Sequence, residues 1–437
     1  MKFASTRNPG TEVSFREAVF AGLAPDGGLY QPTGVPDLGK LIAGFDAGAS
    51  TADICSAVAA ALFAPELPAE AADRVARRAF TFDPALVPLT GDIRILELFH
   101  GPSCAFKDFG ASFLAAVMEE FLTREASRAV ILTATSGDTG SAVARAFHNR
   151  ENIEVVILYP SGRVSPLQEK QLTTLGGNIT ALEVKGSFDD CQRMVKAAFV
   201  DRPLNDRLGL TSANSINLGR LIPQAFYYIY AAVRLPAAER KEGPVFCVPS
   251  GNFGNLTAGV MSSQWGLSVR RFIAATNVNK VVPEYLESGI YAPRPSVPTI
   301  SNAMDVGDPS NFERLESIFG GSREKMRRLI EGIFVTDDET RETIRRVYRE
   351  RGMFLDPHTA LGVRAAERFL ASGAGKGPVV TLATAHPGKF LEVVEEASGL
   401  RPPLPPRLEE SLRLPKSSVV VGNAAEDLKK FLLEKFG

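Results

Sequence analysis

The sequence predicts an α/β protein in which mostly parallel sheets follow an N-terminal structural domain. After Pro84, short apolar runs rich in β-branched residues alternate with amphipathic helical patterns. Such alternation is typical of βαβ units and parallel strands. Glycine-bearing loops separate several of these strands from the helices that follow them. The length of 437 residues favours two or three domains.

The first part of the chain, residues 1–90, does not show the strand–loop–helix pattern of the rest. It contains short helical patterns at Ile54–Phe63 and Ala69–Ala79, and several turn clusters rich in glycine and proline. No group of reactive side chains stands out among these residues. We therefore interpret residues 1–90 as a structural domain.

The βαβ units are clearest where a strand, a glycine-bearing loop and a helix follow one another. The three such units pair strand Arg128–Ala134 with a helix at 141–149, strand Val245–Val248 with a helix at 256–265, and strand Val379–Ala383 with a helix at 389–397. Two further strands and a helix are predicted between the first and second units, at Val155–Tyr159, Ile179–Val184 and Phe188–Val200.

The end of the chain contains a proline-rich connection at Pro402–Glu409 and then a helix. We expect Asn423 to cap this helix, because Glu426 follows three residues later. Its apolar positions, Leu428, Phe431 and Leu432, would share one face.

Composition and charge narrow the classes of function. The formal charge of −1 leaves no basic excess for a nucleic-acid partner. The longest apolar stretches, Ile54–Ala64 and Ala225–Val233, fall short of the ~20 residues that cross a bilayer, so we expect buried helices there and no membrane partner. The N-terminal residues lack the apolar core of a signal peptide. A cytoplasmic location fits best.

The cysteines and histidines are scattered along the chain. None of them forms a C-x-x-C or H-E-x-x-H pattern, so we expect neither a disulfide scaffold nor a protein-built metal site. They are Cys55, Cys104, Cys191, Cys247, His100, His148, His358 and His386.

Two glycine loops could bind an anion. Thr135–Gly140 (TSGDTG) and Ser250–Asn255 (SGNFGN) each lie between a predicted strand and a helix, where unpaired N–H groups point outward. Neither is a P-loop or a G-x-G-x-x-G motif, so two small anionic groups are indicated rather than a dinucleotide. Ordinary turns with helix caps are the alternative.

Lys107 lies among phenylalanines. Phe106, Phe109 and Phe113 surround it in the sequence, and burial among them would lower its pKa and let the neutral amine attack an aldehyde. A lysine whose stem covers apolar surface, with Asp108 paired to a neighbour, is the alternative.

The motifs that carry these candidates resemble those of threonine synthases of the long-chain class. His100–Gly110 (HGPSCAFKDFG), Thr133–Ala142 (TATSGDTGSA) and Pro249–Asn255 (PSGNFGN) occur in the same order as in that family. The resemblance extends over roughly residues 1 to 400, through eight further segments: Ser5–Arg7, Gly22–Tyr30, Val164–Gln171, Thr174–Ile179, Ser212–Arg220, Ala274–Asn279, Ser301–Gly307 and Thr384–Phe390.

This family belongs to the fold type II enzymes that depend on pyridoxal 5′-phosphate (PLP). The resemblance implies a small α/β domain at 121–217, inserted into a large PLP-binding domain at 91–120 and 218–437 that carries a C-terminal extension. The cofactor would lie between the two domains. A monomer or a homodimer is expected.

The resemblance also assigns the cofactor-binding residues. Lys107 would form the Schiff base and shuttle protons, and Thr384 would meet the pyridine nitrogen. Asp138 occupies a position near the 3′ oxygen where shorter-chain relatives carry asparagine, and an ionised aspartate cannot donate the same hydrogen bond. The cofactor's phosphate would be held by the loop Gly251, Asn252, Phe253, Gly254 and Asn255.

The implied substrate is O-phospho-L-homoserine, and the implied reaction is γ-elimination of phosphate followed by addition of water at Cβ, which gives L-threonine. Ser215 and Arg220 match residues that grip the substrate phosphate, with Asn214 and Thr139 as further candidates. Phe106, Phe109 and the loop from Ser136 to Thr139 would line the pocket. The alternatives are a phospho-lyase that releases 2-oxobutanoate, another PLP lyase such as a threonine dehydratase, and a non-catalytic anion-binding protein.

Overall fold

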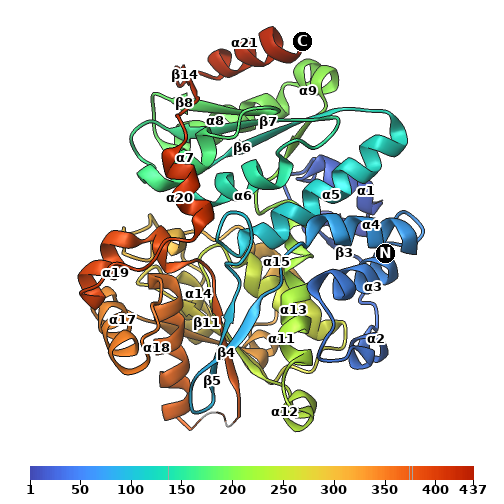
Figure 1. The fold of residues 1–437 in the computed structure, drawn as a ribbon. Helices are drawn as coiled ribbons and strands as arrows, with labels where there is room; N and C mark the ends of the chain where they lie inside the picture. Colours follow the sequence, from blue (N-terminus) through green and yellow to red (C-terminus); the bar gives the residue numbers. More distant parts are fainter. Residues whose placement is uncertain (136, 374, 376) are drawn as a thin grey trace.

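The computed structural model describes residues 1–135, 137–373, 375 and 377–437. Its larger sheet has six strands in the order β12-β11-β10-β13-β5-β4, and every pair except β4–β5 is parallel. We call the part of the molecule built around it the large domain (Figure 1). The strands are β4 (Ala85–Thr90), β5 (Ile93–Glu97), β10 (Val245–Pro249), β11 (Arg271–Thr276), β12 (Ile330–Phe334) and β13 (Val379–Ala383).

The second α/β sheet has five strands in the order β14-β8-β7-β6-β9, all parallel. We call the part built around it the small domain, which lies above the large one in Figure 1. The predicted α/β fold with mostly parallel sheets is confirmed. The strands are β6 (Ala129–Ala134), β7 (Ile153–Pro160), β8 (Ile179–Val184), β9 (Leu210–Ser212) and β14 (Val419–Val421).

The helices follow the strands on both sheets. Helix α5 (Lys107–Glu125) leads into the small domain, whose helices include α6 (Asp138–Phe147), α7 (Pro166–Thr173), α8 (Phe188–Val200) and α9 (Arg202–Leu208). The helices that follow along the chain are α10 (Leu218–Leu221), α11 (Gln224–Val233), α12 (Ala237–Glu242), α13 (Gly254–Gln264), α14 (Val281–Ser288), η1 (Asn302–Met304), α15 (Phe312–Ile318), α16 (Arg323–Leu329), α17 (Asp337–Arg351), α18 (Pro357–Ala371), η2 (Pro387–Lys389), α19 (Leu391–Ser398), α20 (Pro406–Arg413) and α21 (Ala425–Phe436).

The N-terminal residues form a small antiparallel sheet and four helices that share the core of the rest of the molecule. The Phe15 and Phe63 rings stack at 3.7 Å between centroids, and Phe63 also contacts Phe113 of α5. This segment is therefore packed into one continuous core with α5 and α11. Its elements are β1 (Phe3–Ser5), β2 (Glu12–Val13), α1 (Phe15–Ala21), β3 (Tyr30–Pro32), α2 (Gly39–Gly44), α3 (Thr51–Phe63) and α4 (Ala69–Ala79).

The two long apolar stretches of the sequence are the buried helices that we expected. Every residue of α11 is buried, and most of α3 is buried. Within the described part of the chain, no helix is both long and apolar enough to span a membrane.

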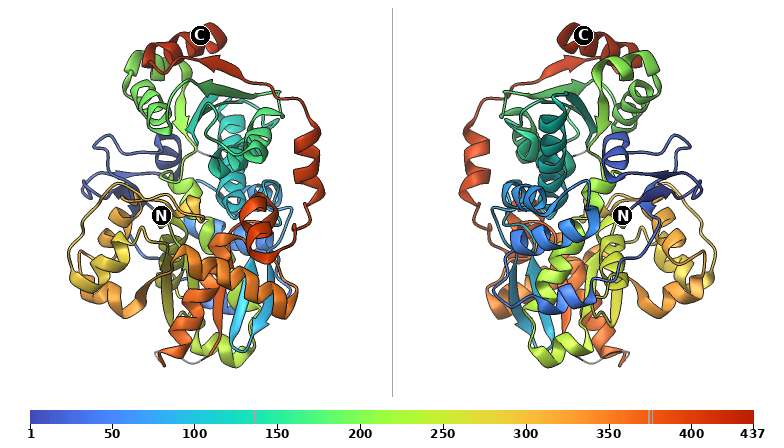
Figure 2. Two further views of the ribbon diagram at one scale, coloured as in Figure 1. Left: turned by 90° about the vertical axis from the view of Figure 1, so that its left-hand side faces the viewer. Right: turned by 90° about the vertical axis from the view of Figure 1, so that its right-hand side faces the viewer.

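The C-terminal segment connects the two domains. From α19 it passes through α20 along one side of the molecule to β14 and α21 (Figure 2). The sequence grouped residues 218–437 with the large domain, but β14 pairs with β8 of the small sheet. Leu428 and Leu432 of α21 are buried in the small domain's core.

The cap predicted for α21 is wrong by one residue. Ala424, not Asn423, precedes the helix, and its N–H donates to the carboxylate of Asp427, not to that of Glu426. The backbone carbonyl of Asn423 instead accepts a hydrogen bond from Arg193 of α8, which holds this residue on the small domain.

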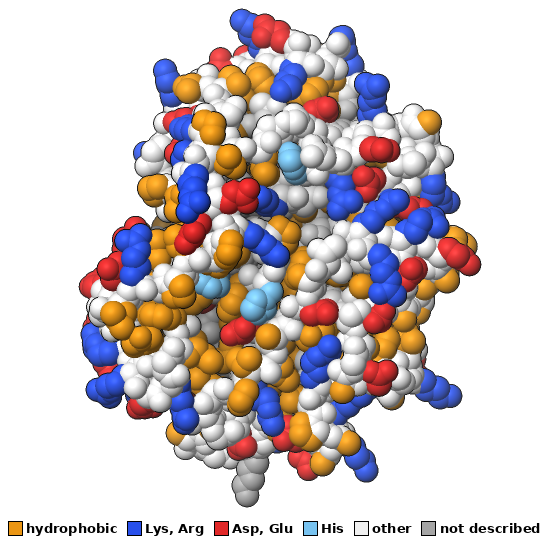
Figure 3. Space-filling model, viewed as in Figure 1, with side chains coloured by type: hydrophobic (Ala, Val, Ile, Leu, Met, Phe, Trp, Pro, Cys, Tyr) orange, Lys and Arg blue, Asp and Glu red, His pale blue; other side chains and the backbone are white. Residues whose placement is uncertain are grey.

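The surface carries both signs of charge intermingled. On the face shown in Figure 3, lysine and arginine side chains alternate with aspartate and glutamate, and no extended field of one sign forms there. This pattern agrees with the near-zero formal charge of −1.

Candidate active site

Lys107 is the first residue of α5, and its amine lies in the middle of the candidate site. The side chain is 19% exposed, so it is largely withdrawn from water yet reachable by a small molecule. Nζ lies 3.7 Å from Asp138 Oδ2 and 5.4 Å from the centroid of the Phe106 ring. Burial lowers the pKa of Lys107; Asp138 opposes this shift, whereas the cations of Lys389 and Arg220 add to it. A neutral amine that can act as a nucleophile or base is thereby favoured.

The three phenylalanines near Lys107 in the sequence occupy different places. Phe109 and Phe113 are fully buried, and their rings meet other core aromatics such as Tyr227. Residues four apart share one face of a helix, and this face of α5 is turned into the core. Phe106 is the ring that contacts the ammonium group.

Asp138, the first residue of α6, contacts two lysines. Its Oδ1 lies 2.7 Å from Lys389 Nζ and accepts a hydrogen bond from Gln168 Nε2 at 3.0 Å. Its Oδ2 faces Lys107. Although burial raises the pKa of Asp138, the two lysines outweigh that effect and hold it well below its usual range. The residue is therefore a carboxylate that accepts hydrogen bonds.

Thr384 lies directly after β13 and is fixed beside the lysine-bearing loop. Its carbonyl accepts a hydrogen bond from Phe106 N at 2.9 Å, and Ala105 forms an antiparallel bridge with Ala385. The residue before Lys107 is thus tied to the carboxyl end of a central strand. The structure therefore brings Thr384 next to the loop that ends at Lys107.

The loop Gly251–Asn255 forms a cradle at the start of α13, after β10. A Cβ at Gly251 would lie 2.7 Å from Met304 Cα, so only glycine fits there. Phe253 has a φ of 60°, which turns the chain into the helix. Asn255 Nδ2 donates to the Pro249 carbonyl and closes the loop. The first N–H groups of α13 have no partner within the helix, as an anion-binding site requires.

The phosphate loop and the predicted substrate segment meet directly. Asn252 Nδ2 donates to Ser215 Oγ at 2.9 Å. The side-chain oxygen Oδ1 of Asn252 accepts a hydrogen bond from Ser310 N at 2.6 Å, which holds the side-chain amide in place. The two sets of residues assigned to two different anions therefore lie side by side.

Arg220 is a buried cation without a carboxylate partner in the described residues. It is 4% exposed; one Nη donates to the Ala213 carbonyl at 2.7 Å, and its Nε has no hydrogen-bond partner there. Burial lowers its pKa to about 10. The Asn214 Oδ1 atom is likewise buried and unpaired. A buried guanidinium in this state is matched to an anionic ligand.

The loop Thr135–Gly140 is less open to an anion than its sequence suggests. Thr135 Oγ1 accepts hydrogen bonds from the N–H groups of Gly137 and Gly140, at 3.0 and 2.9 Å. These donors are therefore already engaged within the loop. Thr139 is half-buried next to Asp138, and Ser136, the remaining predicted residue, lies outside the described residues.

Three residues of the site were not assigned from the sequence: Lys389, Gln168 and Asp108. Asp108 accepts from Ser103 N at 2.9 Å, and burial raises its pKa to about 6. Lys389 has the same local signal as Lys107, a lysine beside a phenylalanine in a short motif. That signal alone does not identify a partner, because Asp138 lies far away in the sequence.

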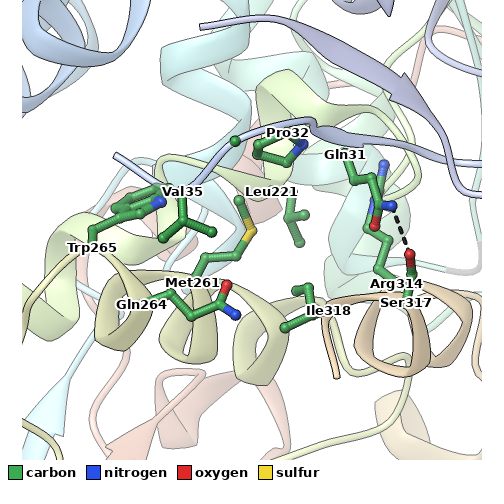
Figure 4. A pocket seen from close by; sticks show the side chains of 11 residues that line it. Gln31, Pro32, Val35, Leu221, Met261, Gln264, Trp265, Arg314, Ser317 and Ile318 are labelled. Atoms are coloured by element: carbon green, nitrogen blue, oxygen red, sulfur yellow. Dashed lines mark hydrogen bonds between the residues drawn. The ribbon is translucent and has the colours of Figure 1, made fainter. Parts of the chain in front are cut away.

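A separate pocket of about 170 Å³ lies between the N-terminal segment and α13 (Figure 4). Its walls include Val35, Leu221, Met261 and Trp265, and a hydrogen bond from Gln31 to Ser317 crosses one end. None of the predicted site residues lines it. This pocket is therefore distinct from the candidate site around Lys107.

The chain matches three family models along its length. These are "Threonine synthase N terminus" at residues 2–80, "Pyridoxal-phosphate dependent enzyme" at 88–385, and "Threonine synthase, C-terminal" at 359–432. A threonine synthase of Haemophilus influenzae is 42% identical over 99% of this chain and 100% of its own length. The chain belongs to the threonine synthase family.

Solved structures of that family agree with the fold. A PLP-bound threonine synthase from Brucella melitensis has a TM-score of 0.94 and 38% identity, covering 100% of this chain and 99% of its own. The threonine synthase from Escherichia coli has a TM-score of 0.88 and 42% identity, covering 99% and 100%. The fold is therefore that of PLP-dependent enzymes of fold type II.

The residues of this chain fit PLP as the family's cofactor. Gly251 lets the loop pack closely against Ala303 and Met304, and N–H groups at the start of α13 remain for a phosphate. The amine of Lys107 is mostly desolvated, as an aldehyde-binding lysine requires. Thr384 offers a neutral hydroxyl at the carboxyl end of β13.

Proposed function

We propose that this chain is a threonine synthase, a carbon–oxygen lyase acting on phosphates that converts O-phospho-L-homoserine and water into L-threonine and phosphate. The observation that carries the substrate assignment is Arg220, a buried guanidinium without a carboxylate partner in the described residues, within the segment that also holds Ser215. Such a group favours an anionic substrate. Relatives named threonine synthase, matched over 95–100% of their length, support the same activity.

The cofactor would be held by residues of both domains. The N–H groups of Gly251–Asn255 would bind the phosphate of PLP, Thr384 its pyridine nitrogen, and Lys107 its aldehyde carbon. Asp138 would lie beside the 3′ oxygen. Bound PLP supplies an electron sink for the negative charge that develops at the substrate's Cα.

The side chains of this chain would move the protons and hold the leaving group. Lys107 Nζ would take the proton from Cα and then assist removal of one from Cβ, which its lowered pKa favours. Arg220 and Ser215 would bind the phosphate as it leaves from Cγ, because the planar guanidinium can form two parallel hydrogen bonds with it. A water molecule would then add at Cβ.

Substitution of Lys107 tests the catalytic assignment. Lys107→Ala should abolish the visible absorption of lysine-bound PLP and the release of phosphate from O-phosphohomoserine. Lys40→Ala, at an exposed lysine of α2, should change neither. Near-normal turnover by Lys107→Ala would refute the assignment.

Substitution of Arg220 tests the substrate-phosphate site. Arg220→Gln should raise the KM for O-phosphohomoserine by about tenfold to 100-fold, because a charge-assisted pair is lost, whereas the exposed Arg202→Gln should leave it unchanged. An unchanged KM in Arg220→Gln would place the substrate phosphate elsewhere.

The identity of the product separates a synthase from a phospho-lyase. Chromatography of the reaction mixture should show L-threonine and phosphate in equal amounts. Accumulation of 2-oxobutanoate and ammonia instead would show that the same residues serve a lyase without the addition of water.

A further inference from the structure

Lys389 is a second lysine of the site, and it is sealed from solvent. Its side chain has 0% exposure, at the end of η2 after β13. Nζ lies 2.7 Å from Asp138 Oδ1 and donates a hydrogen bond to the Ser103 carbonyl at 2.9 Å. A buried ammonium group is costly unless its charge is paired and its protons are bound. Lys389 can therefore be buried here as an ammonium ion only because Asp138 pairs with its charge.

The two carboxylate oxygens of Asp138 have different partners. Oδ1 is held by Lys389 and by Gln168 Nε2. Oδ2 is left facing Lys107, at 3.7 Å from its Nζ. Asp138 also begins α6, where the positive end of the helix favours a carboxylate. The carboxylate thus keeps a permanent counter-ion that does not depend on where Lys107 moves.

The same ammonium group connects the two domains. Asp138 and Gln168 belong to α6 and α7 of the small domain, whereas Lys389 follows β13 of the large sheet. Ser103 lies in the loop that ends at Lys107, and Gln171 of α7 also donates to its carbonyl at 3.2 Å. Lys389 therefore joins the small domain, the large domain and the loop that carries the reactive lysine.

We propose that Lys389 is a positioning residue for the proposed reaction, which binds the Asp138 carboxylate so that it does not pair fully with Lys107, and which fixes the small domain to the lysine-bearing loop. This inference rests on the role proposed for Lys107. The charged groups that influence Lys107 most are Asp138 of α6, Lys389 of η2 and Arg220 of α10, while Asp108 of α5 is bound to Ser103. Without Lys389, Asp138 would pair with Lys107 and stabilise its ammonium form.

Capture of PLP by the full chain freed of cofactor is the first test. Lys107 must be neutral to attack the aldehyde, so the capture rate reports its protonation. Lys389→Met should slow capture about tenfold near pH 7 and much less above about pH 9.5, because Asp138 then raises the pKa of Lys107. Lys389→Arg should retain a rate within about threefold of the unaltered protein. An equal loss at every pH, or no loss, would overturn the proposal.

A double-mutant cycle is the second test. If Lys389 acts through Asp138, Lys389→Met should lower kcat about tenfold in the unaltered protein but cause little further loss in an Asp138→Asn background. Independent, multiplying effects on kcat would overturn the proposal. Lys429→Met, which removes another paired lysine at the small-domain surface, is the matched control.

Two further measurements keep the outcome decisive. If Lys389→Met does not fold, Gln168→Met removes the other donor to Oδ1 at a half-buried site and should lower kcat in the same direction, by a smaller factor. If Lys107→Ala captures PLP as the unaltered protein does, the proposed role of Lys107 fails, and that failure is distinguishable from failure of the Lys389 proposal.

Discussion

Gly251→Ala should weaken PLP binding because the added methyl group has no room. Its Cβ would lie 2.7 Å from Met304 Cα and 2.8 Å from the Ala303 carbonyl oxygen. Carbon atoms in favourable contact are about 3.5–4.0 Å apart. One of the two segments must therefore move by roughly 1 Å, and overpacking of this kind costs about 1–3 kcal/mol.

The segment around Ala303 is the less able of the two to move. Ala303 N donates to His358 Nε2 at 3.2 Å, and the other ring nitrogen of His358 is held by Asp356 at 2.8 Å. Met304 N is bound to the Ser301 carbonyl. The loop at Gly251 is expected to yield instead, away from this segment and into the space of the phosphate.

Titration of the cofactor-free chain with PLP, followed by visible absorption, measures the effect. If the PLP-bound form carries this strain of about 1–3 kcal/mol, the dissociation constant for PLP rises about fivefold to 150-fold. Gly44→Ala, at an exposed position with open space around it, is the control and should bind PLP normally. A dissociation constant for Gly251→Ala within about threefold of the control's would refute the reasoning on the cradle.

Two further predictions concern stability. The pKa of Asp108 is raised to about 6 from an ordinary 3.8, so its contribution to stability is greatest in acid and is lost as the pH rises through about 6. Asp108→Asn should remove this dependence. In denaturant titrations, the unfolding free energy of the variant minus that of the unaltered protein should therefore rise by up to about 3 kcal/mol between about pH 4 and pH 7. A difference that stays constant over this range would contradict the prediction. Leu428→Ala, at a fully buried position of α21, should lower the unfolding free energy by about 2–5 kcal/mol, whereas Leu414→Ala, at 38% exposure, should change it little; equal losses would show that α21 is not part of the core.

The buried parallel strands could be predicted from the sequence because each is a continuous apolar run with a clear end. β8 and β13 have the predicted bounds, Ile179–Val184 and Val379–Ala383. Helix α8 also begins and ends where the 3.6-residue pattern does, and a capping box of Ser187 and Asp190 fixes its start. Local signals sufficed in these elements.

Helix starts at the site were predicted too late in the sequence. Helices α6 and α13 begin at Asp138 and Gly254, each before the predicted residue, and both starts are part of a glycine loop. Glycine and aspartate favour loops on propensity alone, but here they supply the first turn of a helix beside the site. The hydrogen bonds that close each loop, from Gly137 N and Gly140 N to Thr135 Oγ1 and from Asn255 Nδ2 to the Pro249 carbonyl, are not visible in the local propensities.

Partners far apart in the sequence could not be predicted from it. β14 is a three-residue strand, and nothing in its residues indicates that it pairs with β8. The contact between Lys389 and Asp138 is of the same kind, because it depends on how two domains meet. The family motifs contained both residues without indicating that they touch.

The topology explains why so many separate motifs converge on Lys107. The carboxyl ends of parallel strands meet at one edge of a sheet, and ligands of open α/β sheets bind outside that edge. The segments after β6 and β9 of the small sheet supply Asp138 and Arg220, and those after β10 and β13 of the large sheet supply Gly251 and Thr384, so the carboxyl ends of both sheets contribute. The charge of Lys389 is paired with that of Asp138, whereas Arg220 has no carboxylate of its own in the described residues. A surplus of buried positive charge is stable only when anions are bound, which is the condition that the phosphates of PLP and of O-phosphohomoserine would satisfy.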